Sequence, residues 1–178
     1  METTASWTRK SFDWRILVPM SLTLTLLVAD QITKALIVAH VPINTIWARW
    51  WQGWLWIVHE RNLGMALSIG NGAPNVFHLL VIKLVPLSLI IAATIYYFRA
   101  SKLNWYQRWT LASILAGGLG NLIDRFFRPA GVVDFISVKF FGVFGWERFP
   151  TFNVADASVS VGAVLLFSSL LFGRKHHS

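Results

Sequence analysis

Four long apolar stretches divide the chain, and each is about as long as a helix must be to cross a bilayer, roughly 20 residues. They lie at about residues 16–39, 75–98, 109–127 and 153–172. The third is rich in small residues and polar at its end, and the fourth is polar only at its start. This pattern predicts an all-α integral membrane protein with four transmembrane helices. Without repeats, low-complexity tracts or linkers, we expect residues 1–178 to form a single membrane domain.

The first apolar stretch follows basic residues, so a cleaved signal peptide is an alternative. Its length exceeds the 7–15 apolar residues of such a segment, and we expect it to be retained. The next segment, about 40–74, is too polar to span the membrane and holds five tryptophans: Trp47, Trp50, Trp51, Trp54 and Trp56. Its stretch Trp54–Val58 is compatible with a short strand. We therefore expect a small β-element in the extracytoplasmic loop region. An aromatic platform for nucleic acid is less favoured, because this loop lacks the basic groove that such a platform needs.

Composition agrees with a lipid environment. Apolar residues make up 55% of the chain and charged residues 13%, whereas soluble domains carry about 25% charged residues. A chain of 178 residues has too little interior to bury this excess. The composition therefore excludes a soluble globular enzyme and a disordered chain. With no cysteine, it also excludes disulfides, a thiolate nucleophile and a cysteine-based metal site.

Basic residues indicate the orientation of the predicted spans. Eight Lys and Arg residues fall in the N-terminal segment, the loop 99–108 and the tail after 173, against five in the two longer loops. Under the positive-inside rule this distribution predicts cytoplasmic termini. The loops 40–74 and 128–152 then lie on the extracytoplasmic side.

That topology brings acidic and amide side chains to one membrane surface. Asn121 and Asp124 end the third span, Asn153 and Asp156 start the fourth, and Asp134 lies in the loop between them. Two carboxylates close together cannot both ionise, so they share a proton. One can then take a proton from water while the other polarises a carbonyl. The spacing therefore favours aspartic proteolysis, although it does not select two of the three acids.

Other chemistries fit less well. His59-Glu60 begins a zinc-protease string, but Leu63 stands where the second histidine is required, and the other histidines are scattered. No G-x-S-x-G elbow occurs, and no serine at a distinctive turn accompanies Lys34 or Lys83. Two alternatives remain open, a non-catalytic scaffold or lipid-binding protein and a transporter that uses the acids as a proton relay. Lys83 has no functional explanation.

Five short strings, in order, resemble the motifs of bacterial lipoprotein signal peptidase (signal peptidase II). They are D-Q-I-T-K at 30–34, N-L-G-M-A at 62–66, G-N-L-I-D-R at 120–125, V-V-D-F at 132–135 and F-N-V-A-D at 152–156. The resemblance covers about residues 16–172 and matches in length and number of spans. One departure is Leu67, where the family usually has Phe.

The resemblance implies an endopeptidase of the bacterial cytoplasmic (inner) membrane that cleaves diacylglyceryl-modified prolipoproteins just before the lipid-bearing cysteine, without metal or cofactor. It implies a catalytic pair, Asp134 and Asp156. It also implies supporting or substrate-contacting residues: Asn62, Gly64, Asn121, Asp124, Arg125, Asn153, Asp30 and Lys34. The implied partners are the lipid-modified substrate and membrane lipid, and peptide-like inhibitors such as globomycin are expected at the pair.

Several of these residues also have purely structural interpretations. Asp30 and Lys34 are four apart and could form a buried ion pair on one helix face. Asp124-Arg125 could mark a helix end at the lipid headgroups. Asn153 with Asp156 could be an ordinary helix cap, which is compatible with catalysis. Ala116 with Gly120, and Gly117 with Asn121, are pairs of small residues four apart that favour close helix packing.

Overall fold

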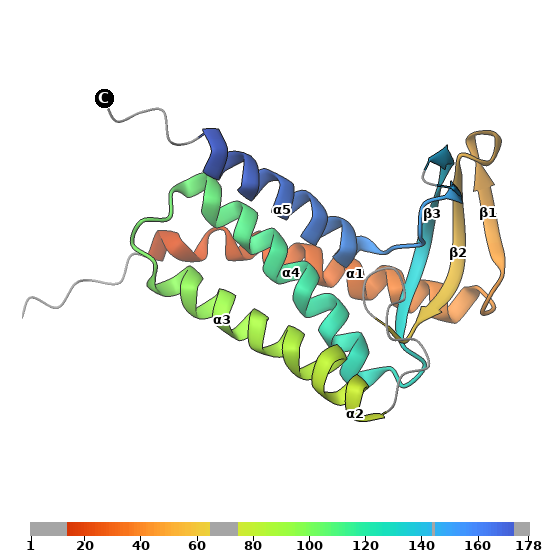
Figure 1. The fold of residues 1–178 in the computed structure, drawn as a ribbon, viewed down its shortest axis with the longest axis horizontal. Coiled ribbons are helices and arrows are strands. Elements are labelled where there is room, and N and C mark those ends of the chain that lie inside the picture. The colour runs from red at the N-terminus through yellow and green to blue at the C-terminus, as the bar shows by residue number, and fades with distance from the viewer. Residues whose placement is uncertain (1–13, 65–74, 144, 173–178) are drawn as a thin grey trace, which may run out of the picture.

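The computed structural model describes residues 14–64, 75–143 and 145–172. Four long helical segments pack side by side, and a small sheet stands at one end of them (Figure 1). The helical elements are η1 (Trp14–Leu17), α1 (Met20–His40), η2 (Trp51–Gly53), α2 (Asn75–Phe77), η4 (His78–Leu84), α3 (Val85–Arg99), α4 (Trp105–Phe127) and α5 (Val154–Phe172). The strands are β1 (Ile46–Trp50), β2 (Leu55–Asn62), β3 (Val132–Val143) and β4 (Trp146–Arg148).

Three helical segments of the described residues are long and apolar enough to cross a membrane: Trp14–His40, Leu79–Arg99 and Val154–Phe172. Helix α4 has 23 residues but is the most polar and the most buried of the four long helices. It begins earlier than predicted because Asn104 caps it, accepting a hydrogen bond from the Gln107 N–H at 2.8 Å. The helical fold is thus confirmed, whereas the count of four spans stays a prediction.

Small residues let α4 approach α5 and α1 closely. A methyl group on Gly117 would collide with the carbonyl oxygen of Ala155 in α5, and one on Gly120 would lie 2.6 Å from the Asp30 Oδ2 atom in α1. Larger side chains would therefore push the helices apart. This confirms the prediction that these positions serve helix packing.

The four strands form one antiparallel sheet in the order β1-β2-β3-β4. A β-element was predicted here, but the prediction that Asp134 lies in a loop is wrong, because Asp134 belongs to β3 and faces Glu60 of β2 in the register. The stretch around Asp134 is rich in β-branched and aromatic residues, which favour a half-buried strand. Strand pairing therefore fixes the position of this acid.

The sheet is joined to the helices through a small apolar cluster. Val133 and Phe135 of β3 pack on Ile37 and Val41 at the end of α1. On the other side, Phe152 exchanges hydrogen bonds with Ile136 of β3, at 2.8 and 3.0 Å, just before α5 begins. These contacts hold β3 beside the first turn of α5.

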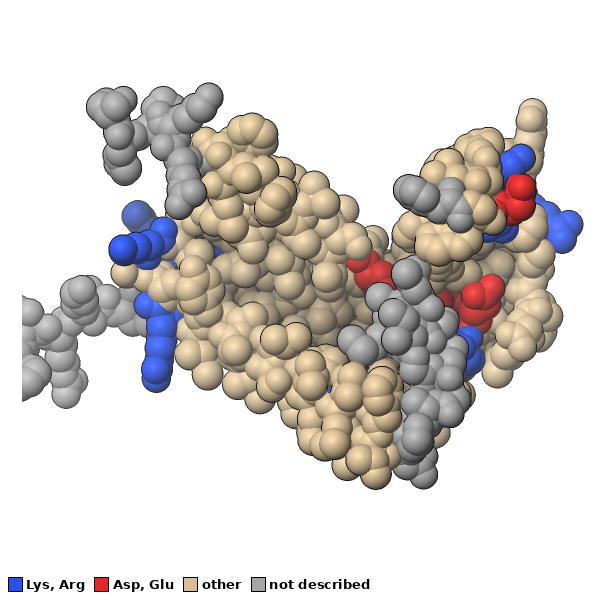
Figure 2. Space-filling view, viewed as in Figure 1, with Lys and Arg blue, Asp and Glu red and all other residues tan. Residues whose placement is uncertain are grey.

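Charged residues gather at both ends of the molecule. Helix α1 begins and α5 ends at the end away from the sheet, where Lys and Arg side chains are exposed (Figures 1 and 2). Acidic side chains are visible where the helices meet the sheet (Figure 2). This arrangement agrees with the predicted orientation, which remains a prediction.

Candidate active site

Asn153 links the two predicted catalytic aspartates. Its Nδ2 atom donates to Asp134 Oδ1 at 2.7 Å, and its backbone N–H donates to Asp156 Oδ2 at 3.1 Å. In return, the Asp156 N–H donates to Asn153 Oδ1 at 2.9 Å, so the two residues cap α5 reciprocally. The structural and the catalytic interpretations of Asn153 are therefore compatible. Capping fixes Asp156 in the first turn of the helix, facing Asp134.

Asn121 of α4 orients Asp156 from the other side. Its Nδ2 atom donates to Asp156 Oδ1 at 2.7 Å. Its Oδ1 atom accepts hydrogen bonds from Lys34 Nζ at 3.0 Å and from Asn153 Nδ2 at 3.1 Å. Because a cation faces the amide oxygen, the amide nitrogen must point toward the carboxylate.

Asn62 performs the same task for Asp134. Its Nδ2 atom donates to Asp134 Oδ2 at 3.2 Å. The Gly64 N–H donates to Asn62 Oδ1 at 2.9 Å, which turns the amide nitrogen toward the aspartate. Gly64 therefore acts through Asn62. The remainder of this motif, Met65 and Ala66, and the Leu67 that follows it lie outside the described residues.

Behind the two aspartates lies a cluster of two acids and two cations, named here the buried ion cluster: Asp30, Lys34, Asp124 and Arg128. Only Arg128 is partly exposed, at 23%. Lys34 is 0% exposed, and its Nζ atom lies 2.8 Å from Asp30 Oδ2 and 3.0 Å from Asp124 Oδ2. Arg128 Nε lies 3.0 Å from Asp124 Oδ1. The predicted ion pair of Asp30 and Lys34 is confirmed. Buried charges are costly unless paired, so each charge of the cluster offsets the cost of burying its partner.

Each acid of the buried ion cluster also holds the backbone next to one predicted catalytic aspartate. Asp30 Oδ1 accepts the N–H of Ala155 at 2.9 Å, immediately before Asp156. Asp124 Oδ2 accepts the N–H of Val133 at 3.3 Å, immediately before Asp134. Lys34 contacts both acids and thereby connects the backbone segments that precede Asp134 and Asp156. Asp124 thus lies in the last turn of α4, as the helix-end interpretation expects, but its side chain is buried and paired inside the protein.

A cavity of about 460 Å³ opens in front of the pair, between α3, α4, α5 and the sheet. Asp134, Asp156 and Arg125 line it, together with apolar residues such as Leu89, Ile90, Ile114 and Val159. The Arg125 Nε atom is buried and has no hydrogen-bond partner among the described residues. The cavity therefore offers two acids and one cation beside an apolar wall.

The environment of Asp134 favours its protonated form. Burial, and then the negative charge of Asp156, raise the pKa of Asp134 to about 7, although hydrogen bonds from Asn62 and Asn153 oppose the rise. The neighbouring cation Lys34 lowers the pKa as well, but less. Near neutral pH, the pair can therefore hold one proton.

Sequence reasoning missed two members of the site's support. Gln31 donates from Nε2 to Asp30 Oδ2 and to the Gly120 carbonyl, both at 3.1 Å, and Arg128 pairs with Asp124. Arg128 follows Asp124 by four residues, a spacing that could have revealed the pair. Lys83, which has no functional explanation at the level of the sequence, lies 5.6 Å from the ring centroid of Phe126, a cation–π contact.

Comparison with known proteins identifies the family. A family model described as signal peptidase (SPase) II matches residues 22–172 of this chain. The chain belongs to the signal peptidase II family. This confirms the resemblance seen in the motifs, and it makes the protein a member of a protease family.

Individual relatives support the same assignment. The lipoprotein signal peptidase of Treponema pallidum (strain Nichols) is 44% identical over 161 residues, covering 90% of this chain and 87% of the relative. That of Treponema denticola is 43% identical over 145 residues, covering 80% and 82%. A bacterial membrane enzyme solved by the in meso method at 2.3 Å has a TM-score of 0.75 and 27% identity, covering 90% and 93% of the two chains. This similarity and the three apolar helices of the described residues show that the signal peptidase II protein is a multi-pass membrane protein.

Proposed function

We propose that this protein removes the signal peptide from diacylglyceryl-modified prolipoproteins by cleaving before the lipid-bearing cysteine, with Asp134 and Asp156 activating the attacking water. One observation carries the proposal: the two carboxylates line one cavity and are hydrogen-bonded to the same residue, Asn153. Membership of the signal peptidase II family supports the prolipoprotein substrate class, and the cleavage site is part of the proposal. The arrangement of the acids supports the aspartic mechanism.

The mechanism follows from one proton on the pair. Because the pKa of Asp134 is raised to about 7, we assign the proton to Asp134 and the negative charge to Asp156. Asp156 takes a proton from water while the water oxygen bonds to the scissile carbonyl carbon, and Asp134 gives its proton to the carbonyl oxygen. When the tetrahedral intermediate collapses, the carbon–nitrogen bond breaks. The amine of the lipid-bearing cysteine then takes the proton from Asp156, and the hydroxyl returns its proton to Asp134.

The surroundings of the pair suit a substrate held in a membrane. The cavity has an apolar wall formed by membrane-helix residues such as Leu89 and Val159. An acyl-bearing substrate can keep its lipid in the bilayer while its peptide bond reaches the acids. By the same geometry, peptide-like inhibitors such as globomycin would bind at the pair. We assign the termini to the cytoplasm and the cavity to the extracytoplasmic side of the inner membrane, on the distribution of basic residues.

The alternatives are a membrane scaffold and a proton-relay transporter, and neither cuts peptide bonds. The test uses purified protein in detergent, a diacylglyceryl-modified precursor peptide and mass spectrometry of the products. We expect a product that begins at the lipid-bearing cysteine, and much slower cleavage of the unlipidated peptide. Absence of cleavage would reject the proposal. EDTA or phenanthroline should leave the rate intact, and loss of activity with rescue by zinc would reject the aspartic mechanism.

A further inference from the structure

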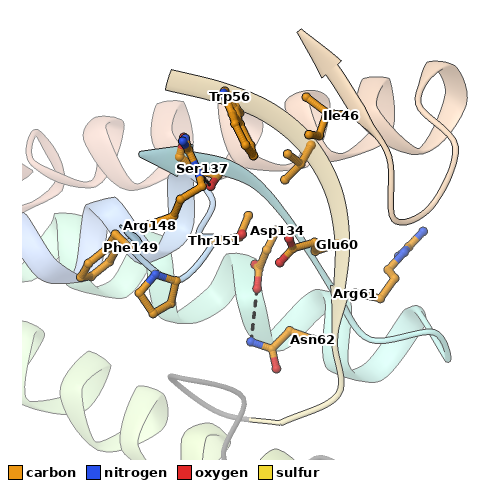
Figure 3. A pocket seen from close by; sticks show the side chains of 12 residues that line it. Ile46, Trp56, Glu60, Arg61, Asn62, Asp134, Ser137, Arg148, Phe149 and Thr151 are labelled. Carbon is orange, nitrogen blue, oxygen red and sulfur yellow. Dashed lines mark hydrogen bonds between the residues drawn. The ribbon is translucent and has the colours of Figure 1, made fainter. Parts of the chain in front are cut away.

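A second cavity of about 390 Å³ lies on the sheet side of Asp134 (Figure 3). Asn62, Asp134 and the segment 149–151 line both this cavity and the one between the helices. Asp134 therefore stands at the junction of two spaces. A polypeptide whose scissile bond reaches Asp134 can extend into both of them.

The two spaces differ in chemistry. The wall between the helices is formed largely by aliphatic side chains. The cavity over the sheet has Glu60, Arg61, Ser137, Arg148 and Thr151 in its lining. Polar and charged groups need a wet, polar surface, so the sheet-side cavity suits a hydrophilic peptide segment.

Glu60 presents its carboxylate to the sheet-side cavity. It is directly opposite Asp134 in the β2–β3 register, and directly opposite residues of an antiparallel pair point to the same face. Figure 3 shows its side chain turned toward Asp134, with Arg61 on the other side of the strand. Glu60 is exposed, and within the described part of the chain its carboxylate forms no hydrogen bond or ion pair.

Two cations also belong to this lining. The Arg61 side chain lies on the other side of the strand from Asp134 (Figure 3) and donates to the Gly131 carbonyl at 3.3 Å. Arg148 is already engaged. Its guanidinium donates to Ser137 Oγ at 2.7 Å, to the Gly53 carbonyl at 2.9 Å and to the carbonyls of Trp54 and Ser137. It also lies 3.8 Å from the ring centroid of Trp56. Four donated hydrogen bonds leave this side chain little capacity for a ligand, because a guanidinium has five N–H groups. The Glu60 carboxylate, which has no such contacts within the described part of the chain, is available to a ligand.

Three parts of the proposed substrate meet at the scissile bond: the apolar signal peptide, the acyl chains and the hydrophilic polypeptide that follows the lipid-bearing cysteine. Only the last matches a polar cavity. We infer that the sheet-side cavity binds the first residues after the lipid-bearing cysteine, and that Glu60 selects cationic or hydrogen-bond-donating side chains there. This inference rests on the proposed function and adds a specificity site to it.

The test compares two diacylglyceryl-modified peptides that differ only in the residue after the cysteine, Lys or Glu. The measured quantity is the ratio of their kcat/KM values. For the wild-type protein we expect the Lys peptide to be favoured by roughly two- to fivefold, the range of an exposed ion pair. Glu60→Gln should bring the ratio close to one, and Glu60→Lys should invert it. Raising the salt concentration should weaken the wild-type preference.

Glu147→Lys is the matched control, because Glu147 is exposed on β4 and does not line the cavity. It makes the same charge change in the same sheet and should leave the ratio as in the wild type. If the wild type and Glu60→Lys cleave both peptides with the same ratio of kcat/KM values, the inference is overturned while the proposed function stays intact. So would an equal change in Glu147→Lys. Failure to cleave either peptide by the wild-type protein would instead reject the proposed function, and with it this inference.

Discussion

Replacing Lys34 with Met removes the central cation of the buried ion cluster. Lys34 and Asp30 are 0% and 1% exposed, and Nζ lies 2.8 Å from Asp30 Oδ2. Removing one partner of a buried pair typically costs about 3–5 kcal/mol, whereas an exposed pair four residues apart contributes about 0.3–0.5 kcal/mol. Asp124 keeps Arg128 as a partner, so Asp30 carries most of the loss. We therefore expect Lys34→Met to lower the free energy of unfolding by about 3–5 kcal/mol.

A double variant separates the charge effect from the loss of packing. Lys34→Met with Asp30→Asn removes both charges, and an asparagine oxygen can still accept the Ala155 N–H. The double variant should therefore be less destabilised than the sum of the single variants, with a coupling energy of about 1–3 kcal/mol. Additive effects would mean that the two charges do not stabilise each other.

The assay is equilibrium unfolding of the purified protein in detergent. Lys83→Met is the matched control, since Lys83 lies in another apolar helical segment and contacts the Phe126 ring rather than an acid. We expect that variant to lose less than about 1 kcal/mol. If Lys34→Met is no less stable than Lys83→Met, the buried ion cluster does not stabilise the fold.

Three further predictions concern pH, packing and topology. The cleavage rate should fall as the pH rises through about 7, because Asp134 then loses the proton it donates. Asn62→Ala should move this fall to higher pH, since a hydrogen bond that lowers the pKa of Asp134 is lost. A flat wild-type rate profile from about pH 6 to 9 would refute the assignment of the donated proton to Asp134. Gly120→Ala should lower the unfolding temperature, because its methyl group would lie 2.6 Å from a carboxylate oxygen of the buried ion cluster. A variant that unfolds at the wild-type temperature would contradict this close packing. Cysteines introduced at Ser101 and Ala130 should be labelled from opposite sides of the membrane, and labelling from one side would reject the four-span topology.

The helices could be predicted because their signal is local. Stretches of about 20 apolar residues are visible in the sequence alone, and so is the spacing of Asp30 and Lys34. The capping role of Asn153 is equally local. These features depend on residues within a few helical turns of one another.

Other features depend on contacts between distant segments. Asp134 lies in a strand because β3 pairs with β2, about 70 residues earlier in the chain, and no turn signal joins the two. The contacts of Lys34 with Asn121 and Asp124 likewise join different helices. Spacing also could not select Asp134 over Asp124, and that choice came from the family motifs. Both acids are buried, but Asp124 is paired with cations whereas Asp134 lines the two cavities.

The catalytic role of the two aspartates is tested most directly by single-turnover cleavage of a diacylglyceryl-modified precursor with purified Asp134→Asn and Asp156→Asn variants. Asparagine keeps the size of the side chain, and thermal unfolding of each variant provides the control for folding. General acid–base groups commonly contribute about 10²–10⁴-fold, and members of one catalytic unit are not additive. We expect each variant to lower the rate at least about a hundredfold, with the double variant little worse. If Asp134→Asn keeps near wild-type turnover while Asp124→Asn abolishes it in a folded protein, the pair has been assigned wrongly.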